Sequence, residues 1–185
     1  MADLNAYREE ITQRVIESAV NSADPVALIT AMTIEYGNLL TSAEIFDNFI
    51  PGSVSGTGSR NRKFRIDGYQ IDASDGSLHL VITDFAEASD SQPMTKSEAE
   101  SLLKHCVYYL DVCRDGSIWN HERSVSDQLE LSEFIEKHSD TITKYRFHLF
   151  TNRLVSDRFK SLEVDEIDGR SADFQIWDIA RLESV

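Results

Sequence analysis

Apolar residues in the first fifty positions recur at the spacing of amphipathic helices. Their three- and four-residue intervals over Leu4–Val20 predict one helix. The pair Asp24–Pro25 is typical of a helix N-terminus and predicts a second helix, Val26–Tyr36, that stops at Gly37. A third short helix is expected to start at Ser42, so this part of the chain is predicted to be largely helical.

The pattern changes over residues 51–59, which are mostly glycine and serine and predict a flexible loop that does not pack. Two runs with alternating apolar and polar positions follow, Phe64–Ile71 and Leu78–Thr83. Because the segment Ala73–Gly76 between them ends in Asp-Gly, the two runs are predicted to form a β-hairpin.

Helices and strands then alternate along the second half of the chain. Thr95, with Glu98 three residues later, forms a capping box that predicts a helix to about Cys113. Another helix is expected to start at Ser124 or Ser126. Two further strands and a final short helix are predicted at Tyr145–Phe150, Phe174–Trp177 and Ile179–Leu182.

These elements predict an α/β (α+β) fold with a central mixed β-sheet flanked by helices. Residues 1–50 form the predicted N-terminal helical segment, which is expected to pack on an α/β core made by residues 51–185. We expect one structural domain, cut from a longer protein, because the sequence stops as its last predicted helix starts.

Net charge is the bulk property of the sequence that limits the possible functions most. The chain carries 18 Lys and Arg against 32 Asp and Glu, a formal net charge of −14, so most of its surface is expected to repel nucleic-acid phosphates. Cys106 and Cys113 lie about 10 Å apart on a predicted helix, which is too far for a disulfide. Reduced thiols, no signal peptide and no apolar run of about 18 residues predict a cytoplasmic protein that does not enter membranes.

The candidate chemistry lies on the predicted hairpin. Asp67 lies in its first strand and Asp84 ends its second, so adjacent strands are expected to bring the two carboxylates to one edge of the sheet. Carboxylate oxygens are ligands that Mg²⁺ prefers, and a bound ion would present a water for attack on a phosphodiester. Asp67 and Asp84 are therefore candidate metal ligands. Glu35, in an early predicted helix, is a third candidate catalytic acid.

This layout is similar to the nuclease core written PD-(D/E)xK, which has a lysine two residues after its second acid. Here Ala86 occupies that position. The lysine stabilises negative charge in the transition state, so Lys63, or else Lys96, is the candidate catalytic residue to replace it. The alternative is structural, with Asp67 hydrogen-bonding the backbone and Asp84 ending a strand.

One dense basic cluster stands out against the acidic composition. It consists of Arg60, Arg62, Lys63 and Arg65. These side chains are candidates for contacts with nucleic-acid phosphates beside Asp67. The alternative is a solvated strand edge that discourages aggregation.

Four segments together resemble the N-terminal domain of the abortive infection phage resistance (AIPR) family. They are Arg65–Tyr69, Leu78–Phe85, Tyr145–Asn152 and Phe174–Leu182. The Asp-Gly-Tyr and Trp-Asp-x-x-Arg-Leu motifs are moderately specific one by one, and their order and spacing carry the resemblance.

The resemblance implies a restriction-endonuclease-like domain that is joined, in full-length relatives, to a larger C-terminal part. That part is the expected partner, and the implied role is bacterial defence against phage by abortive infection. Because Ala86 replaces the lysine, two functions are expected. One is a nuclease-like domain with weak or no catalysis that acts through protein or intramolecular contacts. The other is a Mg²⁺-dependent nuclease that cleaves DNA or RNA.

Overall fold

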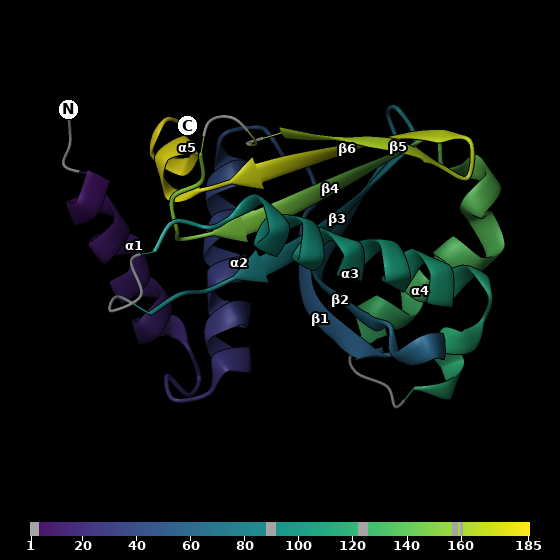
Figure 1. The fold of residues 1–185 in the computed structure, drawn as a ribbon, viewed down its shortest axis with the longest axis horizontal. Helices are drawn as coiled ribbons and strands as arrows, with labels where there is room; N and C mark the ends of the chain where they lie inside the picture. The colour runs from purple at the N-terminus through teal and green to yellow at the C-terminus, as the bar shows by residue number, and fades with distance from the viewer. Residues whose placement is uncertain (1–3, 88–91, 122–125, 157–158, 160) are drawn as a thin grey trace.

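The computed structural model describes residues 4–87, 92–121, 126–156, 159 and 161–185. These residues form a mixed α/β fold in which α-helices lie on both faces of a six-stranded sheet (Figure 1). The predicted mixed sheet with flanking helices is therefore confirmed at this level. No described helix is both long enough and apolar enough to cross a membrane.

The sheet has the strand order β1-β2-β3-β4-β6-β5. The first three strands are antiparallel, β4 and β6 run parallel to β3, and β5 is antiparallel to β6. The strands span Ile50–Thr57 (β1), Lys63–Asp72 (β2), Ser77–Asp84 (β3), Lys144–Thr151 (β4), Ser161–Ile167 (β5) and Arg170–Trp177 (β6).

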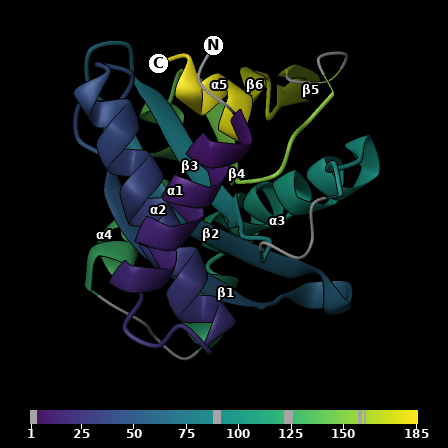
Figure 2. The ribbon, with the colours of Figure 1, turned by 90° about the vertical axis from the view of Figure 1, so that its left-hand side faces the viewer.

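The helices form a layer on each face of the sheet. One layer holds α1, α2 and α5, of which α1 and α2 face the viewer in Figure 2, and the other holds α3 and α4. The helices span Leu4–Ser18 (α1), Pro25–Ser42 (α2), Lys96–Arg114 (α3), Ser126–His138 (α4) and Ile179–Glu183 (α5). Short 3₁₀ turns lie at Ser59–Asn61 (η1), Ser117–Asn120 (η2) and Ser139–Thr141 (η3).

Both faces of the central strands are buried, which explains why Val81 lies between Leu80 and Ile82 in β3, where strict alternation would place a polar residue. Leu80 and Ile82 pack in the cluster beneath α3 and α4, whereas Val81 packs in the cluster beneath α1 and α2. Successive side chains of a strand point to opposite faces, so a strand covered on both sides is buried at almost every position, including its polar residues Ser77, His79 and Thr83.

The hairpin and the predicted starts of α3 and α4 are confirmed. β2 and β3 pair in antiparallel register on either side of the predicted Asp-Gly turn. Thr95 and Glu98 make the predicted capping box at the start of α3. α4 begins at Ser126, and the alternative start at Ser124 lies outside the described residues. Both cysteines are buried free thiols, as predicted.

Two predictions for the N-terminal third are wrong. α2 continues through Gly37 to Ser42. Gly37 does not end the helix but leaves space for an aromatic ring, since a Cβ there would lie 2.3 Å from Phe49. No helix starts at Ser42, since residues 43–49 form turns that carry Phe46 and Phe49 into the core side of α2.

The prediction of an unpacked loop over residues 51–59 is also wrong. Most of this segment is β1, which pairs with β2 along its length. Its small residues are required by packing, since a Cβ on Gly56 would lie 2.6 Å from the ring of Phe64. β5 is a further strand that the apolar pattern did not predict.

Candidate functional site

The carboxyl ends of β3 and β4 meet at one edge of the sheet. Asp84 lies opposite Thr151 in the parallel register, and Thr151 Oγ1 donates a hydrogen bond of 3.0 Å to Asp84 Oδ2. Arg153 places a guanidinium nitrogen 3.7 Å from the same oxygen. Open α/β sheets bind ligands outside the carboxyl ends of their strands. This edge is therefore the candidate site.

Arg153 ties the end of β4 to the start of α3. Its guanidinium donates to Glu98 at 3.1 Å and to the carbonyl of Gln92 at 3.0 Å. Hydrogen bonds from Thr95, and then from Arg153, lower the pKa of Glu98 to about 2, so Glu98 is ionised. Two carboxylates, Glu98 and Asp84, thus share one arginine.

Asp84 is the more accessible of the two predicted acids, with 23% of its side chain exposed. Burial raises the pKa of this carboxyl above its ordinary value, although the hydrogen bond from Thr151 and the charge of Arg153 act in the opposite direction. A half-buried carboxyl with a raised pKa at a strand end is a plausible acid–base group.

Asp67 is fully buried, with 1% of its side chain exposed, and its carboxylate is occupied by protein donors. Ser53 donates to Oδ1 at 2.9 Å. Oδ2 accepts from Arg65 Nε at 3.0 Å, from Arg65 Nη2 at 2.8 Å and from the backbone N–H of Thr83 at 2.8 Å. Such a carboxylate is satisfied within the fold, and a metal ion would have to displace these donors.

Arg65 and Asp67 together continue the pairing of β2 with β3. The backbone pairing between the two strands runs from Asp72, opposite Ser77, to Gly68, opposite Val81. Past it, Thr83 donates its N–H to Asp67, and its carbonyl accepts from the Arg65 guanidinium. The two side chains thereby satisfy both backbone groups of Thr83, the residue that precedes Asp84.

The other predicted residues lie elsewhere. Glu35 on α2 forms an ion pair of 3.2 Å with Arg14 of α1. Lys63 is exposed at the start of β2, and Lys96 pairs with Glu100 at 3.6 Å on α3. Within the part of the chain that the structure describes, none of the recorded contacts joins these three side chains to Asp67 or Asp84.

Ala86, at the position of the lysine in the nuclease pattern, is buried and held by a side chain that the sequence analysis missed. Asn152 accepts from the backbone N–H of Ala86 at 2.9 Å and donates to its carbonyl at 2.8 Å. The same amide donates to Thr12 of α1 at 3.3 Å. Asn152 directly follows the last residue of β4. A polar residue at the end of an apolar strand was the sequence signal that could have identified it.

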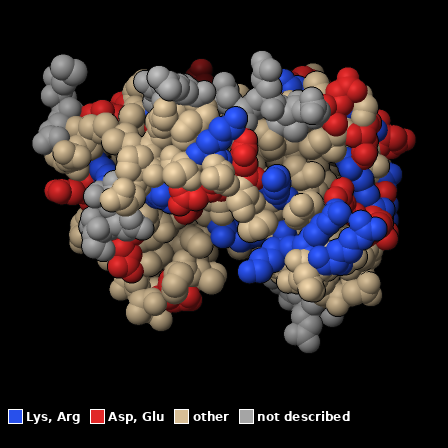
Figure 3. Space-filling model, viewed as in Figure 1, with Lys and Arg blue, Asp and Glu red and all other residues tan. Residues whose placement is uncertain are grey.

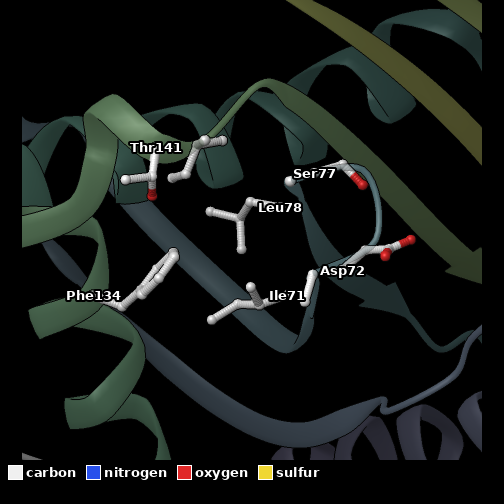
Figure 4. Close-up of a pocket in the computed structure, with 9 residues that line it drawn as sticks. Ile71, Asp72, Ser77, Leu78, Phe134 and Thr141 are labelled. Atoms are coloured by element: carbon white, nitrogen blue, oxygen red, sulfur yellow. The ribbon is translucent and has the colours of Figure 1, made fainter.

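A pocket lies at the far end of the hairpin from these acids. It has a volume of about 210 Å³ and is lined mainly by apolar side chains, among them Ile71, Leu78 and Phe134 (Figure 4). Ligand pockets usually have volumes of about 300–1,000 Å³. The pocket is smaller than that and lies at the start of β3, so it does not contribute to the candidate site.

A chain of buried hydrogen bonds joins β3, β4 and β6 beneath the layer of α1 and α2. Trp177 Nε1 donates to His148 Nδ1 at 3.1 Å, and an indole N–H can only donate. His148 must therefore carry its proton on Nε2, which lies 3.1 Å from His79 Nδ1, and His79 Nε2 in turn lies 3.0 Å from Ser77 Oγ. One arrangement of protons satisfies every member, with both imidazoles neutral.

The neutral histidine pair makes a prediction about pH. Burial lowers the pKa of His79 to about 4 and holds the pKa of His148 well below its ordinary value. In the unfolded chain both bind protons near pH 6.5, so folding stability is present above that pH and is lost as the pH falls through it. His148→Gln is expected to remove about 1 kcal/mol per pH unit from the slope of unfolding free energy between pH 5 and 6. Urea unfolding of the two proteins at several pH values measures this, and equal slopes would contradict it.

The acids at this edge do not fit a Mg²⁺ ion in their present arrangement. Across the described residues, no three His, Cys, Asp or Glu side chains lie together so that they could hold a metal ion. Asp67 is bound to Arg65, and Asp84 is bound to Thr151 and Arg153. The assignment of Asp67 and Asp84 as metal ligands stays a prediction.

The fold and the site define a mixed α/β domain with an acid–arginine cluster at the carboxyl edge of its sheet. The model of one family, the abortive infection phage resistance protein N-terminal domain, matches residues 32–184. The chain therefore belongs to this family, and the resemblance is confirmed. No curated protein and no solved structure matches the chain at a significant level.

Proposed function

We propose that this AIPR N-terminal domain is nuclease-like in fold but does not cleave nucleic acid, and that it acts by binding. Its partner in this proposal is the C-terminal region of the full-length protein or another molecule of the defence response. The observation that carries the proposal is the state of Asp67. The carboxylate that would serve as the first metal ligand is held in the fold by Arg65, Ser53 and Thr83.

The position of the missing lysine supports the same conclusion. Ala86 is buried, and Asn152 binds both of its backbone polar groups. This position therefore supplies no positive charge to the two acids. The cations that approach the acids are arginines that already pair with them, Arg65 with Asp67 and Arg153 with Asp84. An arginine bound in this way offsets the charge that would attract a metal ion.

The competing function is a Mg²⁺-dependent nuclease that uses Asp67, Asp84 and Glu35, with Lys63 or Lys96 in place of the lysine. It would require Asp67 to exchange its donors for metal. Glu35 would have to leave Arg14, on the side of the sheet covered by α1 and α2. What favours this alternative is Asp84, whose raised pKa and partial exposure suit acid–base chemistry.

A metal titration tests the proposal. We expect calorimetry with Mg²⁺ or Mn²⁺ to give no saturable heat up to about millimolar concentrations, because the carboxylates are already paired. Incubation with metal and plasmid, linear DNA or RNA should leave the nucleic acid intact. Asp84→Asn is the matched variant, since it removes the more accessible of the two acids and leaves the Asp67 contacts unchanged. Saturable binding or cleavage that Asp84→Asn abolishes would overturn the proposal.

A further inference from the structure

Basic side chains gather on one face of this acidic chain. Arg60, Arg62 and Lys63, from η1 and the start of β2, are exposed, and so is Lys104 on α3. Figure 3 shows a band of blue Lys and Arg atoms on this face of the molecule, in the region where Figure 1 shows α3 and the start of β2. Because the chain as a whole carries a net charge of −14, this band is a local exception.

An aromatic ring lies within the band. The Arg62 guanidinium lies over the ring of Tyr108, 5.1 Å from its centroid, and Tyr108 is half-buried on α3. Lys104 is four residues before Tyr108, so the two side chains share one face of the helix. The band thus combines exposed cations with a ring that Arg62 already holds in place.

The acids near the band are already paired with basic side chains: Glu100, four residues before Lys104 on α3, lies 3.6 Å from Lys96. Asp111 lies 4.0 Å from Arg62, at the limit of an ion pair, and Asp67 is bound to Arg65 beneath the surface. His105 on α3 has its pKa lowered by burial and then by the nearby charges of Arg65 and Lys63. It is neutral at pH 7 and adds a hydrogen-bonding group without adding charge.

We propose that this face, made by Arg60, Arg62, Lys63, Lys104 and Tyr108, binds single-stranded nucleic acid. Arg60, Lys63 and Lys104 contact phosphates, and a base takes the place of the Arg62 guanidinium on the ring of Tyr108. The inference rests on the proposed function, since it names the partner of a domain that binds without cleaving. A single strand fits better than a duplex, because only a single strand offers an unstacked base face to the ring of Tyr108.

The expected binding is weak and depends on salt. About three phosphate contacts predict a slope of about −2 for log K against log salt concentration, and a Kd on the order of 10–100 µM near physiological salt. Binding to a duplex of the same length should be at least about tenfold weaker. DNA and RNA strands should bind alike, because phosphates and base faces are common to both.

Fluorescence anisotropy with labelled 20-nucleotide dT and rU strands tests this at low salt. Lys63→Glu and Lys104→Glu should each weaken binding about tenfold, whereas Lys137→Glu on α4 makes the same charge change at another exposed lysine and should have little effect. Tyr108→Leu should weaken binding about tenfold, and Tyr108→Phe should not, because phenylalanine keeps the stacking face.

Several outcomes would overturn the inference. They are no binding of either strand, equal loss with Lys137→Glu, equal binding of the duplex, or competition by poly-glutamate as strong as by unlabelled strand. The last outcome would assign the face to an acidic protein segment instead. Cleavage of the strands is scored on a gel in the same samples. Cleavage would contradict the proposed function but not this inference, because it does not alter the assignment of the binding face.

Discussion

Asp67→Asn is expected to lower the free energy of unfolding by about 3 kcal/mol, because it breaks a buried ion pair on one side only. Asparagine keeps the shape of the side chain. It places an amide N–H₂ against donors from Arg65, Ser53 or Thr83 and leaves the Arg65 guanidinium without its counter-charge. Urea unfolding followed by circular dichroism measures the loss. The variant is expected to fold, since domains of this size have stabilities of about 5–15 kcal/mol.

Asp84→Asn is the matched control for this variant. It should change the unfolding free energy by less than about 1 kcal/mol, because the carboxyl is partly exposed and burial already disfavours its charge. In a metal site both acids would repel one another in the absence of the ion, and both replacements would be neutral or stabilising. An unchanged or increased stability of Asp67→Asn would therefore contradict a structural role for Asp67.

A double-mutant cycle separates the ion pair from the other contacts of Asp67. Arg65→Met alone should destabilise by about 2–3 kcal/mol, since it leaves Asp67 charged and buried. The double variant with Asp67→Asn should cost less than the sum of the two single losses, by at least about 1 kcal/mol. Additive losses would show that Arg65 and Asp67 do not act as a pair.

The elements that local signals define were predictable from the sequence. The Asp-Gly turn between two alternating runs predicted the β2–β3 hairpin, and Thr95 with Glu98 predicted the start of α3. β1 and the end of α2 were not predictable in this way, because their glycines are required by packing against side chains from other parts of the fold. Gly56 lies against Phe64, and Gly37 lies against Phe49, so a residue type that locally indicates a loop or a helix end serves packing instead.

The candidate site divides along the same line. Adjacent strands were enough to predict that Asp67 and Asp84 lie near one end of the hairpin. The partners of Asp84 were not predicted, since Thr151 and Arg153 lie at the end of β4 and just after it, more than sixty residues later in the chain. One signal was available locally. Arg65 and Asp67 are two residues apart in a strand and therefore point to the same face, which favours an ion pair over a metal ligand.

Gly68→Ala is expected to destabilise the domain by about 3 kcal/mol, although it adds a single methyl group. A Cβ on Gly68 would lie 2.5 Å from Phe49 Cζ and 3.1 Å from the carbonyl oxygen of Ile50. The Phe49 ring cannot move away, because its other side packs against the backbone of Gly37 in α2, where an added Cβ would lie 2.3 Å from the ring. The ring also stacks on Phe46, with 5.2 Å between the centroids. The glycine of the Asp-Gly-Tyr motif is thus explained by packing. Thermal and urea unfolding measure the loss.

Gly169→Ala provides the control for the change of side chain. Gly169 has a φ of 71° and no atom within 4 Å of an added Cβ, so alanine there costs only about 1 kcal/mol of backbone strain. Shortening the ring should relieve the steric clash: in a Gly68→Ala, Phe49→Leu double variant, the cost should be smaller than the sum of the two single costs. If Gly68→Ala is tolerated as well as Gly169→Ala, the ring is not confined between α2 and β2, and packing does not explain the glycine that follows Asp67.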